Sequence, residues 1–146
     1  RIHKVKSRIA VKETFTDENL VSMKDNCENI RDLALLEFLI STGVRVGEVV
    51  KLNKNDIDFE NRSCIVLGKG NRQREVYFDA KTKIHLEEYL QSRHDDSDGL
   101  FVSMRAPHGN LSISGVELII RNIGKISNIG SAYPHKFRRT CYDGNR

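Results

Sequence analysis

An apolar run at residues 33–40, LALLEFLI, most constrains how this chain can fold. A helix with apolar side chains on nearly every side is covered only when it lies at the centre of its domain. We therefore expect a buried central helix over residues 29–42, with the other elements packed around it. Gly43 should end this helix, because glycine adopts the left-handed backbone of a helix end at little steric cost.

A second, shorter helix is expected directly afterwards, over residues 45–52, because three valines recur there at the spacing of one helix face. Arg45 lies at the junction of the two helices, where a cation opposes the helix dipole, so local helix energetics do not explain it. Glu48 follows one turn later and is expected to hold the guanidinium. Two interpretations stay open: Arg45 is a rigid fork for an anion, or it is an exposed arginine on an ordinary helix-turn-helix.

The composition of the chain limits the classes of protein to consider. Its 146 residues fit one domain with a core, and its net charge of +4 favours a polyanionic partner without proving one. Three cysteines without a CxxC pair predict reduced thiols in the cytoplasm and no zinc site, with Cys27 and Cys64 in the core. The aspartates of residues 94–99, HDDSDG, lack EF-hand spacing and are expected to be solvated. No apolar run reaches the length of about 18 residues that a membrane span needs.

Residues 1–12, RIHKVKSRIAVK, are rich in lysine and arginine and contain no acid. We interpret them as a basic linker or arm that precedes a single domain at residues 13–146. A solvated tail is the simpler alternative, whereas the whole block has the charge to follow a phosphate backbone.

The remaining patterns predict an α+β fold that is mostly helical, a helical bundle with a small three-stranded antiparallel sheet. The sheet should occupy residues 57–78, where apolar and polar residues alternate around turn signals. Other expected elements are a helix capped by Thr16 with an apolar stripe of Leu20, Met23 and Cys27, a helix over residues 80–93 with Ile84, Leu86, Tyr89 and Leu90 inward, a short strand LFVS at residues 100–103, and a helix opened by a capping box of Ser114 and Glu117.

The expected hairpin tip, GKGNRQ at residues 68–73, is basic and bounded by glycines. Lys69, Arg72 and Arg74 on such a loop suit contacts to backbone phosphates. Lysine at a hairpin tip also protects a sheet from edge pairing, so a structural interpretation stays open. The tip is not a Walker motif, because GxxxxGK[ST] is absent.

The last segment, YPHKFRRTCYDGNR, begins with a proline suited to a first helical turn. His135 and Arg138 then lie at positions i and i+3 on one helix face. A histidine and an arginine side by side can bind an oxyanion and move a proton, although HxxR alone is a common chance pattern.

Three motifs follow one another along the chain: TGVRVGE, the strand–GKG–strand hairpin, and HKFRRT. In this order they resemble the catalytic domain of the tyrosine recombinases, the phage integrase family, and TFTDENL resembles the opening of that domain. The resemblance covers residues 13–140. It implies site-specific DNA recombination or integration through strand cleavage and rejoining, with a 3′-phosphotyrosine intermediate and no metal or cofactor.

The resemblance also assigns roles to individual residues. Arg45 and Arg138 would be the two arginines that stabilise the charge of the phosphate in the transition state. Lys69 would be the general acid for the leaving 5′ oxygen, and His135 would assist proton transfer. Glu48 would support the site without reacting.

The implied partner is double-stranded DNA, with self-association on DNA, no membrane, no small-molecule substrate, and a cytoplasmic location at the nucleoid. The chain departs from the family pattern in one respect. The family's second histidine or tryptophan and its nucleophilic tyrosine lie well downstream of HxxRxT, whereas Tyr142 is only one helical turn beyond Arg138. We interpret Tyr142 as structural and expect a carboxy-terminally incomplete domain that is inactive alone. The alternative is a non-catalytic fragment that binds DNA or caps a partner.

Overall fold

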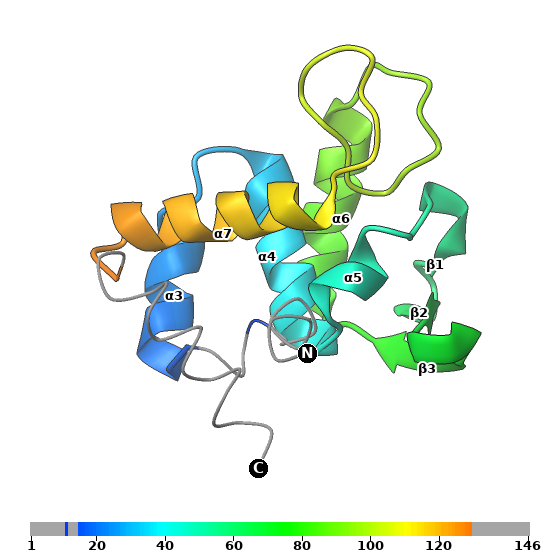
Figure 1. The fold of residues 1–146 in the computed structure, drawn as a ribbon, viewed down its shortest axis with the longest axis horizontal. Helices are drawn as coiled ribbons and strands as arrows, with labels where there is room; N and C mark the ends of the chain where they lie inside the picture. Colours follow the sequence, from blue (N-terminus) through cyan, green and yellow to red (C-terminus); the bar gives the residue numbers. More distant parts are fainter. Residues whose placement is uncertain (1–10, 12–14, 130–146) are drawn as a thin grey trace.

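The computed structural model describes Val11 and residues 15–129, and it has the predicted α+β architecture (Figure 1). The helices surround α4, and three strands form one antiparallel sheet in the order β1-β2-β3. The elements are α3 (Asp17–Asp25), α4 (Ile30–Thr42), α5 (Val46–Val49), η1 (Lys54–Asp56), β1 (Ile57–Asp58), β2 (Ser63–Leu67), η2 (Lys69–Asn71), β3 (Gln73–Tyr77), α6 (Ala80–Ser92) and α7 (Ile113–Ile126).

Helix α4 is the buried central helix that its apolar run predicts. It lies between α3 and α6 and also contacts β3 (Figure 1). The side chain of Asn29 caps its start by accepting a hydrogen bond from the backbone N–H of Asp32 at 2.9 Å. Gly43 ends it at φ 72°, the left-handed conformation that a glycine adopts without strain.

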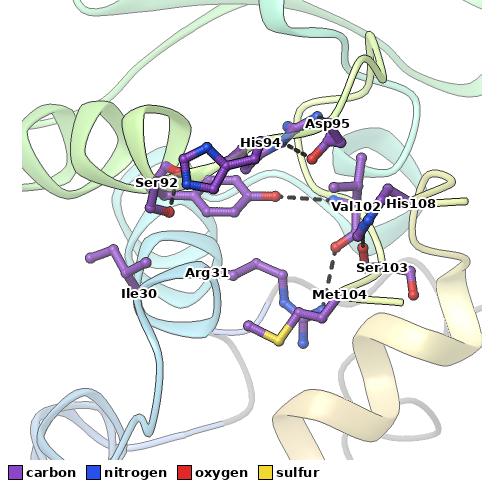
Figure 2. Close-up of a pocket in the computed structure, with 11 residues that line it drawn as sticks. Ile30, Arg31, Ser92, His94, Asp95, Val102, Ser103, Met104 and His108 are labelled. Carbon is purple, nitrogen blue, oxygen red and sulfur yellow. Dashed lines mark hydrogen bonds and ion pairs between the residues drawn. The ribbon is translucent and has the colours of Figure 1, made fainter. Parts of the chain in front are cut away.

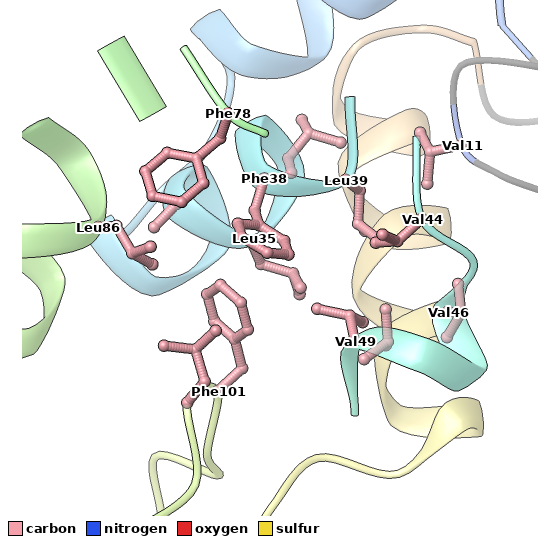
Figure 3. Packing of buried hydrophobic residues seen from close by; sticks show 14 of the residues in the cluster. Val11, Leu35, Phe38, Leu39, Val44, Val46, Val49, Phe78, Leu86 and Phe101 are labelled. Atoms are coloured by element: carbon pink, nitrogen blue, oxygen red, sulfur yellow. The ribbon is translucent and has the colours of Figure 1, made fainter. Parts of the chain in front are cut away.

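The core is built around the ring of Phe38 on α4 (Figure 3). Its centroid lies 5.9 Å from that of Phe78, which follows β3, and 6.0 Å from that of Phe101 in the loop before α7. Tilted and edge-on aromatic pairs at these separations are favourable beyond the area that they bury. One α4 side chain therefore ties the sheet and the long loop to the helical layer.

The sheet is a short meander with one buried face. Cys64 on β2 pairs with Val76 on β3, and both are buried, as is Val66. Arg74 is the partner of Val66 in the ladder, and the basic tip begins beyond the next pair, Leu67 and Gln73. A single turn of 3₁₀-helix forms the tip, with Gly70 at φ 70°.

Two predicted helix boundaries are wrong. Helix α5 spans only Val46–Val49, because the chain turns immediately after it instead of continuing to residue 52. Helix α7 is capped by Ser112, whose hydroxyl accepts a hydrogen bond from the backbone N–H of Gly115 at 3.0 Å. Ser114, the predicted cap, already lies inside the helix, because the chain becomes helical directly after the extended backbone of Ser112.

Two predictions of side-chain and strand placement also need correction. Ile84 on α6 is 59% exposed, whereas Thr82 is buried; the face of α6 that meets α4 carries Thr82, Leu86 and Tyr89 at helical spacing. The LFVS segment forms only an isolated bridge between Val102 and Asn110, because it pairs with no neighbouring strand of the described sheet. None of the described helices is long and apolar enough to span a bilayer.

Both described cysteines are unpaired thiols. Cys64 is buried, and Cys27, which lies just beyond α3, is partly buried against the core. Burial raises the pKa of Cys64 to about 11 and that of Cys27 to about 12. Both thiols therefore stay protonated at neutral pH, as expected of core cysteines.

Gly43→Ala tests the junction between α4 and α5. A side chain at φ 72° should lower the free energy of unfolding by about 1–2 kcal/mol. Gly124→Ala is the matched control, because a Cβ there meets no neighbouring atom within 4 Å and the position is inside α7. The control should raise the free energy of unfolding by about 0.5–1 kcal/mol in urea titrations. Equal effects of the two changes would contradict this account of the junction.

Candidate functional site

A groove of about 660 Å³ lies between α5, the β2–β3 hairpin and the first residue of α7. We call it the α5 groove. Three cations and one carboxylate line it: Arg45, Lys51, Lys69 and Glu48. The groove brings together Arg45 and Lys69, which come from separate motifs of the sequence.

Arg45 is held at the groove by its neighbours in sequence. Val44 and Val46, on either side of it, are 0% and 3% exposed, and they anchor the backbone in the core (Figure 3). Arg45 itself has an extended backbone, φ −85° and ψ 156°, at the position that caps α5, and it is exposed. The backbone of Arg45 is therefore fixed, while its side chain is exposed at the groove.

Glu48 is a buried carboxylate, 7% exposed, that joins two elements of the site. Its Oε1 accepts a hydrogen bond from the backbone N–H of Arg45 at 2.9 Å and another from Nη2 of Arg74 at 2.9 Å. The sequence predicted that Glu48 would hold the guanidinium of Arg45. The bond that the structure has is to the main chain of Arg45, and the guanidinium that Glu48 binds is that of Arg74 on β3.

The hairpin tip is shaped by its glycines. The backbone N–H of Gly68 donates to the carbonyl of Arg72 at 2.7 Å, which closes the loop. A Cβ on Gly68 would lie 3.1 Å from Oε2 of Glu48, so a glycine lets the hairpin approach α5 closely. Lys69 and Arg72 are exposed at this tip.

Lys51 is a groove residue that the sequence did not single out. It lies in the turn after α5, and the sequence pattern placed it at the end of a longer helix. No local motif distinguishes it from any exposed lysine, so only the tertiary arrangement reveals it.

His135, Arg138 and Tyr142 lie outside the described residues. The arm at residues 1–12 does too, except for Val11, which is 3% exposed and packs in the core. The predicted roles of His135 and Arg138 therefore stay predictions.

A second pocket, of about 270 Å³, lies between α4, α6 and the loop before α7 (Figure 2). Arg31, one of the cations that line it, donates hydrogen bonds to Asp32 and to the carbonyl of Val102. Arg93 donates to Asp95 and to the carbonyls of Gly99 and Leu100. Both guanidiniums are already hydrogen-bonded to groups of the protein itself. This pocket is therefore less suited than the α5 groove to binding an external anion.

Arg93 organises the loop at residues 94–99. It binds Asp95 at 2.7 Å, and its guanidinium carbon lies 5.6 Å from the ring centroid of Tyr89. The hydrogen bonds from Arg93 lower the pKa of Asp95 to about 2. The prediction that all three aspartates of this loop are solvated is therefore wrong for Asp95, whose side chain is 8% exposed.

Comparison with known proteins places the chain in a family. Residues 13–143 match the Phage integrase family. The tyrosine recombinase XerC of Staphylococcus aureus is 35% identical over 122 residues, which are 80% of this chain and 40% of that protein. A crystal structure of XerA recombinase superimposes with a TM-score of 0.72 at 30% identity, over 87% of this chain and 47% of that chain. The chain belongs to the phage integrase family of tyrosine recombinases.

A further solved structure extends the likeness of fold. XerH recombinase, in a pre-cleavage complex with its difH substrate, gives a TM-score of 0.63 at 20% identity, over 92% of this chain and 41% of that chain. The chain thus spans about two fifths of the curated relative and less than half of each of these solved chains.

Arg93→Gln tests the assignment of the second pocket as a structural one. Without the guanidinium, the pKa of Asp95 should return from about 2 toward 3.8. Because the folded-state pKa is the depressed one, the pair stabilises the fold fully above pH 4 and less as the pH falls toward 2. Stability measured at a series of pH values should therefore differ most between wild type and variant above about pH 4.

The pKa itself is measured by NMR titration of the Asp95 carboxyl carbon. Asp58 is the internal control, because hydrogen bonds from Asn61 lower its pKa independently of Arg93. An unchanged Asp95 titration in the variant would contradict the assignment.

Proposed function

We propose that the α5 groove binds a backbone phosphate of double-stranded DNA, as part of the catalytic domain of an enzyme that cuts and rejoins DNA. The observation that carries this proposal is the convergence of Arg45 and Lys69 on one groove from α5 and the hairpin. A guanidinium fork and an ammonium group beside a single hollow are suited to a phosphodiester.

The proposed chemistry gives each candidate residue a separate role. The Arg45 guanidinium would bind non-bridging oxygens of the scissile phosphate, which gain charge in the transition state. Lys69 would protonate the leaving 5′ oxygen as a general acid, while the nucleophilic tyrosine that the family resemblance implies would form the 3′-phosphotyrosine bond. Arg138 would bind the same phosphate and His135 would assist proton transfer, by resemblance to the family.

The proposed partner is supported by a solved protein of the same fold. XerH is solved with its difH substrate, in complexes before and after cleavage. Exposed Lys69 and Arg72 suit phosphate contacts, which position a duplex without reading its sequence. Self-association on DNA and a cytoplasmic place at the nucleoid complete the proposal.

A second candidate function is DNA binding without cleavage. It is favoured by Tyr142, which stands one helical turn after Arg138 in the sequence, so both side chains would leave the same helix face. A tyrosine beside the arginine that grips a phosphate is poorly placed for in-line attack on that phosphate.

Incubation with a nicked suicide DNA substrate separates the two functions. For this chain we expect no protease-sensitive covalent adduct on denaturing gels, because Tyr142 follows Arg138 by only four residues, whereas the family's nucleophilic tyrosine lies well downstream. An adduct that disappears in Tyr142→Phe would show that Tyr142 is the nucleophile and that the chain is itself catalytic.

The proposed phosphate contacts are tested by the salt dependence of binding to a DNA duplex. With about five contacts, log K should fall against log salt with a slope of roughly −4 to −5. Lys69→Gln combined with Arg72→Gln should make this slope shallower by about 1.8, since each lost contact removes about 0.9.

Lys125→Gln is the matched control for the loss of a cation. It lies in the last turn of α7, whereas the groove touches only Ile113 at the other end, roughly 18 Å away along the helix. The control should leave the slope unchanged. A flat salt titration for the wild-type chain would contradict the proposal.

A further inference from the structure

The ion pair between Glu48 and Arg74 joins two elements that are distant in sequence. Glu48 lies in α5 and Arg74 on β3, 26 residues later, and Nη2 of Arg74 lies 2.9 Å from Oε1 of Glu48. The Glu48 side chain is 9% exposed and that of Arg74 is 43% exposed. The carboxylate is thus fixed in the protein, while the guanidinium reaches it from the surface of the sheet.

The same carboxylate oxygen also accepts the backbone N–H of Arg45. A single oxygen therefore joins the residue that carries the groove guanidinium to the strand that carries the hairpin. The other oxygen, Oε2, lies 3.1 Å from the point where a Cβ of Gly68 would be, so the hairpin lies against the carboxylate. Lys69 is the next residue in the chain.

We propose that Glu48 and Arg74 form a latch that holds the hairpin on α5 and so positions Lys69 beside Arg45. Arg74 is then a positioning residue. The sequence alone had suggested that Arg74 contacts a phosphate, as Arg72 is proposed to do. The inference rests on the proposed role of Lys69 for its functional meaning, but the latch exists in the free protein.

The structure distinguishes Arg74 from Arg72 on physical grounds. Arg72 is an exposed residue of the tip, and its backbone carbonyl closes the loop by accepting from Gly68. Arg74 lies at the base of the hairpin, opposite the buried Val66 in the ladder, where a bond to α5 limits the swing of the whole tip. Loss of the Arg74 bond would release the tip from α5, so that the hydrogen bonds within its turn would open more often.

The latch is tested without DNA, by hydrogen exchange of the backbone amides of Gly68 and Asn71, which are bonded within the tip. Arg74→Gln should speed their exchange about two- to fivefold, the size expected for a partly exposed ion pair, with no change in the amides of α4 and α6. Arg72→Gln removes the same charge from the same hairpin and should leave the exchange unchanged. In Arg74→Lys, which keeps a cation, the same two amides should exchange more slowly than in Arg74→Gln.

A double variant tests whether the two residues act together. Glu48→Gln keeps the shape of the side chain, and when it is combined with Arg74→Gln it should add little to the effect of the single changes. Fully additive effects, or tip exchange in Arg74→Gln equal to that in Arg72→Gln, would overturn the latch. Failure of the wild-type chain to bind DNA would count against the proposed function. It would not affect the test of the latch, because the exchange is measured without DNA.

Discussion

The burial of α4 is the constraint on which the rest of the structure depends. A helix with side chains such as Leu35, Phe38 and Leu39 almost fully buried must be enclosed by α3, α6 and the sheet. Because α4 ends sharply at Gly43, the chain turns there. Arg45 then lies at the surface, between two residues that are buried in the core. The position of the groove guanidinium is therefore a consequence of core packing.

The buried carboxylate of Glu48 extends this constraint to the hairpin. A charge removed from water is costly unless it finds hydrogen-bond donors. Glu48 finds one in the main chain of Arg45 and one in Arg74, so satisfying the charge also fixes the relative positions of α5 and β3. An electrostatic requirement of folding and the geometry of the proposed phosphate site are met by the same contacts.

The sequence predicted most of the fold because periodicity and helix caps are local signals. The bounds of α4 and the antiparallel sheet follow from such patterns. The prediction for Ile84 failed because the buried face of α6 includes the polar Thr82, and the prediction for Ser114 failed because Ser112, two residues earlier, caps α7. The prediction of a short strand at residues 100–103 was wrong, because the apolar residues of a buried loop have the same sequence pattern as a short buried strand.

The candidate site was predicted differently. The pairing of Arg45 with Lys69 came from resemblance to a family, because no rule of spacing brings residues 24 positions apart together. Lys51 and the bond between Glu48 and Arg74 were missed, since both depend on how α5 packs on the sheet. Local signals therefore describe the elements, and tertiary contacts define the groove.

The central claim is that the α5 groove receives the DNA backbone. It is tested most directly by following the backbone amide signals of the ¹⁵N-labelled chain in NMR spectra as a short DNA duplex is added at low salt. We predict that the largest changes fall on the two segments that line most of the groove, at 45–51 and 67–71. Changes confined to the loop that Arg93 organises, or no changes within the groove, would contradict the account.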